Sequence, residues 1–272
     1  MFVWYYVEYG VDILMLVNER HSKIRAGLEK NGAVTVAELS KAFGVSDETV
    51  RRDLLALERE GVLSRVHGGA IAAATLKPAG EFSVRIDEHR REKNELSHLA
   101  AELIEDGDII AIDAGTTALE FAEIIKDKFK NLTVITHSLG VFNILSQSDT
   151  IQTVLVGGSY DKGEDAFWGH LTAQSLRSLH VAKAFIFPTG ISLSCGVSDF
   201  HLALADVQNT LLTIADKIIV LADSSKFEKT SLCKLCDLKP EHTYVTDKNL
   251  PDSIFDLYRE NNLMILKGKC LK

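Results

Sequence analysis

The chain has 272 residues, of which 46% are hydrophobic and 25% are charged. This composition is typical of a globular protein and excludes a disordered or membrane-embedded one. The net charge of −8 argues against nucleic-acid binding by the chain as a whole, but the acidity is uneven. Residues 15–72 hold nine Lys and Arg against eight Asp and Glu, whereas residues 73–272 hold 21 against 28.

The first fourteen residues, MFVWYYVEYGVDIL, are rich in aromatic side chains. They lack the basic start and the cleavage site of a signal peptide. Glu8 and Asp12 interrupt a stretch that is already too short to span a membrane. We therefore expect residues 1–14 to be an N-terminal extension with no part in the fold.

Two helices are predicted at the start of the segment 15–72. The first covers residues 18–31 and carries an apolar stripe. The second opens at Thr35, where Glu38 three residues later completes a capping box, and it ends at Gly44.

A third helix begins at Ser46, which is a good N-cap residue, and stops at Gly61. A short strand at 62–66, a Gly68-Gly69 turn and an apolar return at 70–73 then predict a hairpin. Three helices joined by short glycine-containing turns and followed by a hairpin are typical of a winged helix-turn-helix.

The third helix has one apolar and one charged side. Val50, Leu54 and Leu57 recur at the spacing of a buried helical stripe, whereas Arg51 and Arg52 lie on or beside the opposite side. Such a helix, followed by a hairpin that carries basic residues, is how a winged helix-turn-helix meets DNA. An ordinary amphipathic helix followed by a hairpin is the alternative.

The region after residue 72 changes in character. Residues 72–80 are rich in Ala and then in Pro and Gly, which predicts a linker. Residues 81–105 show a long, charged helical pattern with its apolar positions on one side. We expect this single helix to couple two domains.

From residue 108 onward, short apolar runs alternate with amphipathic segments of roughly ten residues. This rhythm predicts βαβ units and a mostly parallel sheet covered on both faces. The predicted strands are residues 109–113, 132–136, 151–156, 183–187, 217–222 and 243–246.

Small, hydroxyl and charged residues follow four of these strands. Ligands of such sheets bind beyond the carboxyl ends of the strands, and a helix N-terminus there favours an anion such as phosphate. Taken singly, each group also fits an ordinary turn, cap or hydrogen-bonded strand end. Together they predict a site for a small phosphorylated ligand. The groups are Asp113-Ala-Gly115-Thr116-Thr117, Thr136-His137-Ser138, Gly157-Gly158 and Asp223-Ser-Ser-Lys226.

The four cysteines do not form a disulfide framework. Cys233 and Cys236 are a lone C-x-x-C pair with no second pair and no His at zinc spacing, so metal or redox use is the weaker alternative. We expect reduced thiols in a cytoplasmic protein without a metal or cofactor. No nucleophile elbow, Walker loop or GxGxxG is found, which favours a sensor over an enzyme.

These motifs resemble the DeoR family of bacterial transcriptional regulators. The resemblance spans residues 15 to about 250 and is most specific in one string of the third helix and hairpin. It implies a winged helix-turn-helix followed by a domain similar to ribose-5-phosphate isomerase that serves as a receptor for a phosphorylated sugar. The matching strings are ERHSKI, VSDETVRRDLLALEREGVLSRVHGGA, IIAIDAGTT, LTVITHS, LVGG, LADSSKF and TYVTD.

The resemblance also implies which residues make contacts. Those expected on operator DNA are Ser46, Thr49, Arg51, Arg52, Arg65 and His67. Those expected around the effector are Asp113, Gly115, Thr116, Thr117, His137, Ser138, Gly157, Gly158 and Lys226. His137 and Asp161 depart from the family pattern, which usually has Asn at the first position and often a basic residue near the second.

The sequence thus predicts a repressor of a carbohydrate operon that acts as a homo-oligomer, a dimer or tetramer, and responds to a phosphorylated sugar. The alternatives are an isomerase-like sugar-phosphate enzyme with an accessory helical domain, and a module whose helix-turn-helix binds protein. We expect four segments, which are an extension at 1–14, a DNA-binding domain at 15–72, a linker and connecting helix at 73–105, and an effector-sensing domain at 106–272.

Overall fold

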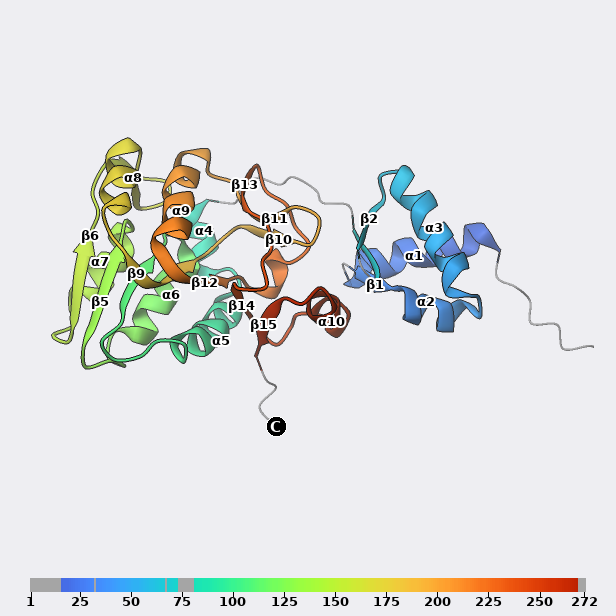
Figure 1. The fold of residues 1–272 in the computed structure, drawn as a ribbon, viewed down its shortest axis with the longest axis horizontal. Coiled ribbons are helices and arrows are strands. Elements are labelled where there is room, and N and C mark those ends of the chain that lie inside the picture. The colour runs from blue at the N-terminus through green and yellow to red at the C-terminus, as the bar shows by residue number, and fades with distance from the viewer. Residues whose placement is uncertain (1–15, 32, 67, 73–80, 269–272) are drawn as a thin grey trace, which may run out of the picture. The chain divides into compact units, whose positions relative to one another are not determined.

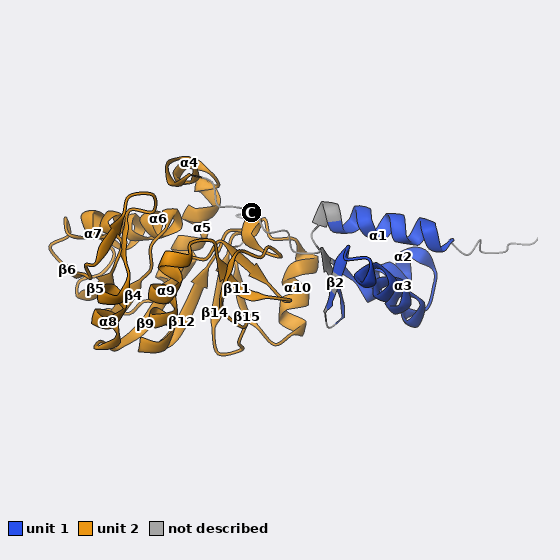
Figure 2. Cartoon of the chain, turned by 90° about the horizontal axis from the view of Figure 1, so that it is seen from above, with its two compact units in different colours: residues 1–73 blue, residues 74–272 orange. Residues whose placement is uncertain are grey.

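The computed structural model describes residues 16–31, 33–66, 68–72 and 81–268. The chain divides into two compact units, residues 1–73 and 74–272 (Figure 2). The predicted extension at 1–14, most of the predicted linker, and His67 lie outside the described residues.

The first unit consists of three helices and a small antiparallel sheet with the strand order β1-β3-β2 (Figure 1). The three predicted helices and the predicted hairpin are present. β1 was not predicted, because a three-residue strand leaves too short a pattern to detect. The elements are α1 (Val17–Asn31), β1 (Ala33–Thr35), α2 (Val36–Phe43), α3 (Asp47–Arg59), β2 (Leu63–Val66) and β3 (Gly69–Ala72).

Local side-chain chemistry sets the ends of α2 and α3. The Thr35 hydroxyl accepts a hydrogen bond from the backbone N–H of Glu38, and the Glu38 carboxylate accepts one from the backbone N–H of Thr35, as the capping box predicts. Gly44, with φ of 65°, ends α2 in the left-handed region that glycine adopts without strain. Ser46 then caps α3 by accepting from the N–H of Thr49 at 3.3 Å.

The core of this unit is apolar, with one buried ion pair at its side. Arg20 of α1 donates two hydrogen bonds to Asp53 of α3, at 2.6 and 3.0 Å, and both residues are at most 6% exposed. The two-pronged pairing fixes the angle between the helices and compensates both charges for their loss of water. The apolar core comprises Ile24, Leu28, Val34, Val36, Leu39, Phe43, Val50, Leu54, Leu57, Leu63 and Ala70.

The second unit is built on a seven-stranded sheet in the order β15-β14-β12-β9-β4-β5-β6, and all of its strand pairs are parallel. The predicted mostly parallel sheet is therefore confirmed, and the six predicted strands differ from the observed ones by at most two residues at either end. The seventh strand, β15, was missed. The strands are β4 (Ile109–Ile112), β5 (Leu132–Thr136), β6 (Ile151–Leu155), β9 (Val181–Ile186), β12 (Ala215–Leu221), β14 (Thr243–Thr246) and β15 (Met264–Lys267).

Helices cover both faces of this sheet. In Figure 2, α5, α6 and α7 lie on one side of the strands, and α8 and α9 lie on the other. Helices α5, α6 and α7 bury Leu96, Phe121 and Val141, respectively, against the central strands in one apolar cluster. The helices are α5 (Arg90–Ala101), α6 (Thr116–Ile125), α7 (Leu139–Leu145), α8 (His170–Arg177), α9 (Leu202–Ile214) and α10 (Asp252–Glu260).

The predicted single helix over residues 81–105 is wrong. The segment forms α4 (Phe82–Asp87) and then α5, and the chain turns between them because Glu88 is extended and His89 has a left-handed φ of 53°. The helical apolar stripe runs only through the second half of the segment, so the first half lacks the burial that would continue a helix. Arg85, not an apolar residue, is the buried side chain of α4.

Two smaller sheets complete the second unit. One is the hairpin of β7 (Ser159–Asp161) and β8 (Ala166–Trp168), and the other joins β10 (Gly190–Ser192), β11 (Gly196–Asp199) and β13 (Cys233–Cys236). No helix within the described residues is both long and apolar enough to cross a membrane.

Candidate functional site

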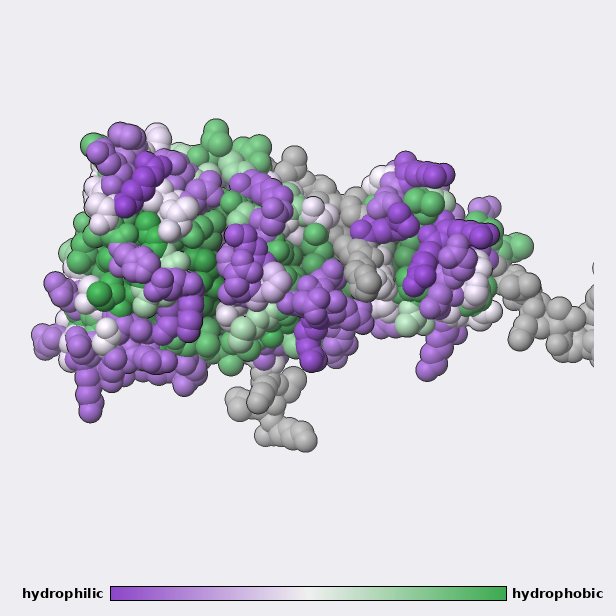
Figure 3. All heavy atoms as spheres, in the orientation of Figure 1, coloured by the Kyte–Doolittle hydropathy of each residue, from purple (hydrophilic) through white to green (hydrophobic). Residues whose placement is uncertain are grey.

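The first candidate site is the exposed side of α3. Arg51 and Arg52 are exposed there, and Ser46 and Thr49 lie at the N-terminal end of the same helix. Arg52 contacts Glu48 one turn earlier at 3.2 Å, with both side chains largely in solvent. Such a surface pair is worth little, so Arg52 can exchange it for a phosphate or a base edge. The face of this unit in Figure 3 is mostly hydrophilic over α3.

Arg65 of the hairpin, which was predicted to contact DNA, is hydrogen-bonded to a residue of α3. Its guanidinium Nε and its backbone N–H both donate to the Glu58 carboxylate at 2.8 Å. These two bonds lower the pKa of Glu58, so the carboxylate stays ionised and keeps its hold on Arg65. Arg65 is exposed, but a contact with DNA requires it to leave this partner or to share it.

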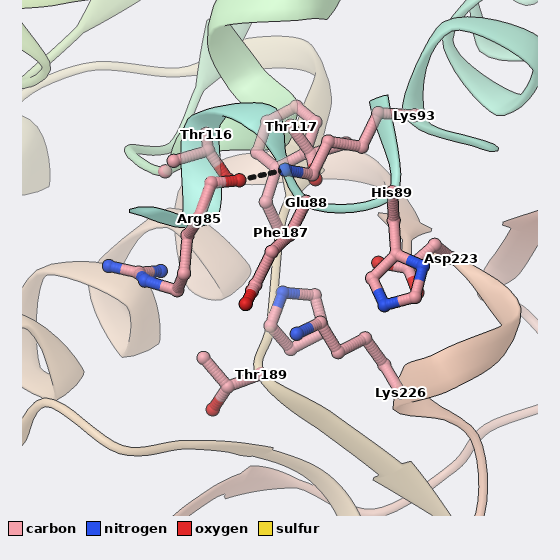
Figure 4. Close-up of a pocket in the computed structure, with 12 residues that line it drawn as sticks. Arg85, Glu88, His89, Lys93, Thr116, Thr117, Phe187, Thr189, Asp223 and Lys226 are labelled. Atoms are coloured by element: carbon pink, nitrogen blue, oxygen red, sulfur yellow. Dashed lines mark hydrogen bonds between the residues drawn. The ribbon is translucent and has the colours of Figure 1, made fainter. Parts of the chain in front are cut away.

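The second candidate site is a pocket beyond the carboxyl ends of β4, β9 and β12 (Figure 4). Four of the predicted effector residues line it. The pocket volume is about 30 Å³, which is room for roughly two water molecules. The four residues are Gly115, Thr116, Thr117 and Lys226.

The N-terminus of α6 faces this pocket without a side-chain cap. Gly115 occupies the cap position with φ of 128°, a conformation that favours glycine, and it has no side chain to satisfy the first N–H groups of the helix. By contrast, Ser138 caps α7 through its own hydroxyl. The α6 N-terminus thus keeps donors and a positive dipole end for an anion.

Lys93 of α5 is a further cationic group of the pocket. It is 4% exposed, its ammonium donates to the backbone carbonyl of Arg85, and no ion pair to a carboxylate is found for it within the described residues. Burial lowers the pKa of Lys93. A buried ammonium without a contacting counterion is costly, and a bound anion would supply the missing charge.

Three of the predicted effector residues lie behind the pocket in a buried network. The Asp113 carboxylate contacts His137 Nε2 at 2.9 Å and accepts from Gln208 Nε2 at 3.0 Å. The other nitrogen of His137 lies 2.8 Å from the carbonyl oxygen of Phe167. Ser138, the third, is used as the helix cap. All three are at most 1% exposed and do not line the pocket.

A second carboxylate, Asp199, shares the amide of Gln208 with Asp113. Burial, together with the nearby charge of Asp113, raises the pKa of Asp199. This network fixes the turn that follows β4 and so positions Gly115 and Thr116.

The remaining predicted residues, Gly157 and Gly158, follow β6 and do not line the pocket either. A Cβ on Gly158 would lie 2.0 Å from the Thr172 hydroxyl oxygen, whereas one on Gly157 would meet nothing within 4 Å. Gly158 therefore allows close packing against α8.

Several pocket residues were missed by the sequence analysis, and four of them lie in the segment that was interpreted as a continuous helix. The many charged residues of segment 85–93 were a sign of a binding site. The sequence did not show the turn at His89, so it gave no reason to place these residues at the strand ends. The missed residues are Arg85, Glu88, His89, Lys93, Phe187, Pro188 and Thr189, whereas Asp223 belongs to one of the predicted strand-end groups. Among the described residues, no group of three His, Cys, Asp or Glu could hold a metal ion.

The two units together define a class of protein, a helix-turn-helix unit joined to an α/β unit with a pocket at the carboxyl ends of its strands. Comparisons with known proteins assign the family. The model described as "DeoR-like helix-turn-helix domain" matches residues 20–75, and that described as "DeoR C terminal sensor domain" matches residues 88–248. The chain belongs to the DeoR family of transcriptional regulators. It is thus a DNA-binding regulator and not an enzyme.

Curated relatives match over nearly their whole length. The "Putative aga operon transcriptional repressor" of Escherichia coli O157:H7 is 31% identical, covering 93% of this chain and 94% of that protein. The "L-fucose operon activator" of Haemophilus influenzae is 30% identical, over 91% and 99%. The "Lactose phosphotransferase system repressor" of Lactococcus lactis is 34% identical, over 85% and 91%.

A solved ribose 5-phosphate isomerase from Methanocaldococcus jannaschii overlaps part of the fold. It shares 18% identity over 52% of this chain and 55% of that chain, with a TM-score of 0.38. A TM-score this low carries no weight for activity.

Proposed function

We propose that this regulator represses a carbohydrate-metabolism operon, that it binds its operator as a homo-oligomer, and that a phosphorylated sugar in the pocket of the α/β unit controls it. The observation that carries the proposal is the pocket itself, where the N-terminus of α6 has no side-chain cap and the buried Lys93 forms no ion pair with a carboxylate of the described residues. Relatives named for aga, fucose and lactose systems support a carbohydrate operon.

The phosphate would bind at the α6 N-terminus, with the Thr116 and Thr117 hydroxyls and the two lysines, Lys93 and Lys226, around it. Backbone N–H groups, hydroxyls and ammonium groups are the donors that phosphate oxygens accept best. Figure 4 shows the Lys226 side chain reaching into the middle of the pocket. Asp113 and His137 support the turn behind this site without contacting the ligand.

On the DNA side, Arg51 and Arg52 of α3 would enter the major groove, with Ser46 and Thr49 near the phosphates at the start of the helix. Arg65 and His67 of the hairpin would contact the backbone. The first unit is close to electroneutral, so two copies bound together would supply the affinity that one lacks.

Ligand binding would reach the DNA-binding unit through α4. This helix is the first element after the boundary between the two units, and the Lys93 ammonium donates to its Arg85 carbonyl. An anion in the pocket would compete for that ammonium and loosen α4. The two positions of α4 would bias DNA-competent and DNA-incompetent arrangements.

The test combines a ligand screen with operator binding. A thermal-shift screen of sugar phosphates should raise the melting temperature with one or a few of them. The same compounds should weaken binding to a labelled duplex from the gene's own promoter, measured by fluorescence anisotropy. A protein that ignores that duplex with every compound would contradict the proposal.

A further inference from the structure

Glu58, near the C-terminal end of α3, binds Arg65 of β2 through two separate hydrogen bonds. Its carboxylate oxygen Oε1 accepts from the backbone N–H of Arg65, and Oε2 accepts from the guanidinium Nε, both at 2.8 Å. The Glu58 side chain is 33% exposed and that of Arg65 is 42% exposed, so the pair lies at the surface of the DNA-binding unit. One carboxylate thus holds both the strand and the side chain that this strand presents.

The backbone bond anchors the hairpin. β2 is an edge strand of the sheet β1-β3-β2, so the N–H groups on its outer side have no partner within the sheet. Glu58 supplies an acceptor for one of these groups, and a neutral carbonyl oxygen would supply it too. The second bond, to the guanidinium of Arg65, adds nothing to this anchor and therefore needs its own explanation.

That second bond leaves the outer edge of the guanidinium open. A guanidinium is a rigid planar fork with five N–H donors, and Glu58 uses only the one on Nε. Within the described residues, neither terminal nitrogen of Arg65, Nη1 or Nη2, forms a hydrogen bond or an ion pair. These two nitrogens form the edge that binds a phosphate group through parallel hydrogen bonds. Arg65 can therefore keep Glu58 and bind a phosphate at the same time.

We propose that Glu58 is a positioning residue for DNA binding, which holds the Arg65 guanidinium with its open edge ready for a backbone phosphate. An arginine side chain that is free in solution loses rotamer freedom when it contacts DNA, and this loss weakens binding. The bond to Glu58 restricts the side chain before DNA arrives. The inference rests on the part of the proposed function that places Arg65 on the DNA backbone, and it is independent of the pocket in the α/β unit.

Charge alone predicts the opposite effect of Glu58. A carboxylate near DNA repels the phosphates, so neutralising an exposed glutamate of this unit should tighten DNA binding slightly. If Glu58 positions Arg65, neutralising Glu58 should weaken DNA binding instead. The sign of the change in affinity therefore separates positioning from charge.

The decisive variant is Glu58→Gln. Its amide oxygen can still accept from the Arg65 backbone N–H, so β2 keeps its anchor, whereas its amide nitrogen is only a donor and cannot accept from Nε. Binding of the full chain to a labelled duplex from the gene's own promoter is measured by fluorescence anisotropy. We expect about two- to tenfold weaker binding, because the Arg65 side chain is no longer restricted. The melting temperature should stay close to that of the wild type.

Glu60→Gln is the matched control. Glu60 is an exposed glutamate at the end of the same helix and pairs with Arg25 of α1. The control removes the same charge two residues away without touching Arg65. It should leave DNA binding unchanged or tighten it slightly.

Two variants of Arg65 test whether the effect acts through this side chain. Arg65→Ala should itself weaken DNA binding, and adding Glu58→Gln to it should cause no further loss. Arg65→Lys tests the same geometry with Glu58 intact. It keeps the positive charge, but an ammonium lacks the rigid fork that binds a carboxylate on one edge and a phosphate on another. Its affinity for DNA should therefore lie closer to that of Arg65→Ala than to that of the wild type.

Each of the other results would contradict the inference. If Arg65→Ala weakens DNA binding and Glu58→Gln does not, Arg65 contacts DNA without help from Glu58. If Glu58→Gln weakens binding equally when Arg65 is already Ala, the loss comes from a change in the fold. Wild-type affinity in Arg65→Lys would show that charge alone suffices. If Arg65→Ala binds DNA like the wild type, the proposed contact of Arg65 with DNA is wrong as well.

Discussion

Gly157 and Gly158 are adjacent in the sequence, yet their surroundings differ completely. A methyl group on Gly158 would collide with Thr172 and with the backbone carbonyl of Trp168, whereas Gly157 faces open space. Gly158→Ala should therefore destabilise the α/β unit by about 1–3 kcal/mol, as overpacking does, and Gly157→Ala should change little. Urea unfolding of the two variants measures this. Equal stability of the two variants would show that α8 shifts to accommodate the added methyl group without loss of free energy of unfolding.

Arg52 is the residue on which the DNA interface can be tested most directly. Arg52→Ala should weaken binding to the promoter duplex roughly tenfold or more and make its salt dependence shallower by about one phosphate contact. Anisotropy titrations at several salt concentrations measure both quantities.

Arg177→Ala is the control for this variant, because Arg177 is a similarly exposed, ion-paired arginine of the α/β unit. It should leave DNA binding unchanged. If Arg52→Ala binds the operator with full affinity, Arg52 does not contact the DNA.

Among the elements, α4 has an unusual distribution of side chains. Val84 and Ile86 are 53% and 41% exposed, whereas Arg85 is buried in an ion pair with Glu164. His201 Nε2 lies 2.7 Å from the same Glu164 carboxylate. The buried side chain of this helix is thus a charged one, and its ion pair with Glu164 contributes to the attachment of α4.

The contact between His201 and Glu164 makes a contribution to stability whose pH dependence has a defined sign. The bond to Glu164 raises the pKa of His201, with support from Asp199, against burial and the charge of Arg85. Burial alone would raise the pKa of Glu164, but His201 and Arg85 lower it below its usual value, so this carboxylate stays ionised above pH 6. The contact between His201 and Glu164 thus contributes fully to the stability of the α/β unit below about pH 6.5, and this contribution is lost as the pH rises through the raised pKa.

The free energy of unfolding of the full chain, measured by urea unfolding, should therefore decrease from about pH 6 to pH 8 through the contact between His201 and Glu164. In His201→Asn this part of the decrease should be absent. If the variant keeps the full pH dependence, another group causes it.

At the scale of the whole molecule, the proposal requires the two units to be separable in function. Lys226→Ala removes a pocket cation, so sugar phosphates should no longer change operator affinity, while binding without ligand should stay within about twofold of the wild type. Lys162→Ala, a change of an exposed lysine on the β7–β8 hairpin, should keep the response. Loss of operator binding in Lys226→Ala itself would mean that the pocket also supports the DNA-competent state.

Much of the fold could be predicted because it depends on short-range signals. The capping box at Thr35, the Ser46 cap and the six strand patterns each lie within a few residues, and the structure contains them all. The strand β15 was missed, although at four residues it is as long as β4 and β14, which were predicted.

The site was predicted less completely. Sequence order indicated which residues follow strands, but not which of their side chains point into the pocket. Thr116, Thr117 and Lys226 do, whereas Asp113 and His137 turn inward to each other. That choice depends on Gln208, which lies 95 residues from Asp113 along the chain.

The sequence by itself determined the class of this protein, because helix caps, apolar periodicities and the family motifs are local properties of the chain. Only the tertiary structure decided which groups share the pocket. It placed Lys93 and Asp223 there, more than a hundred residues apart along the chain, and buried both side chains. Burial results from the packing of distant elements, so no local pattern could have reported it.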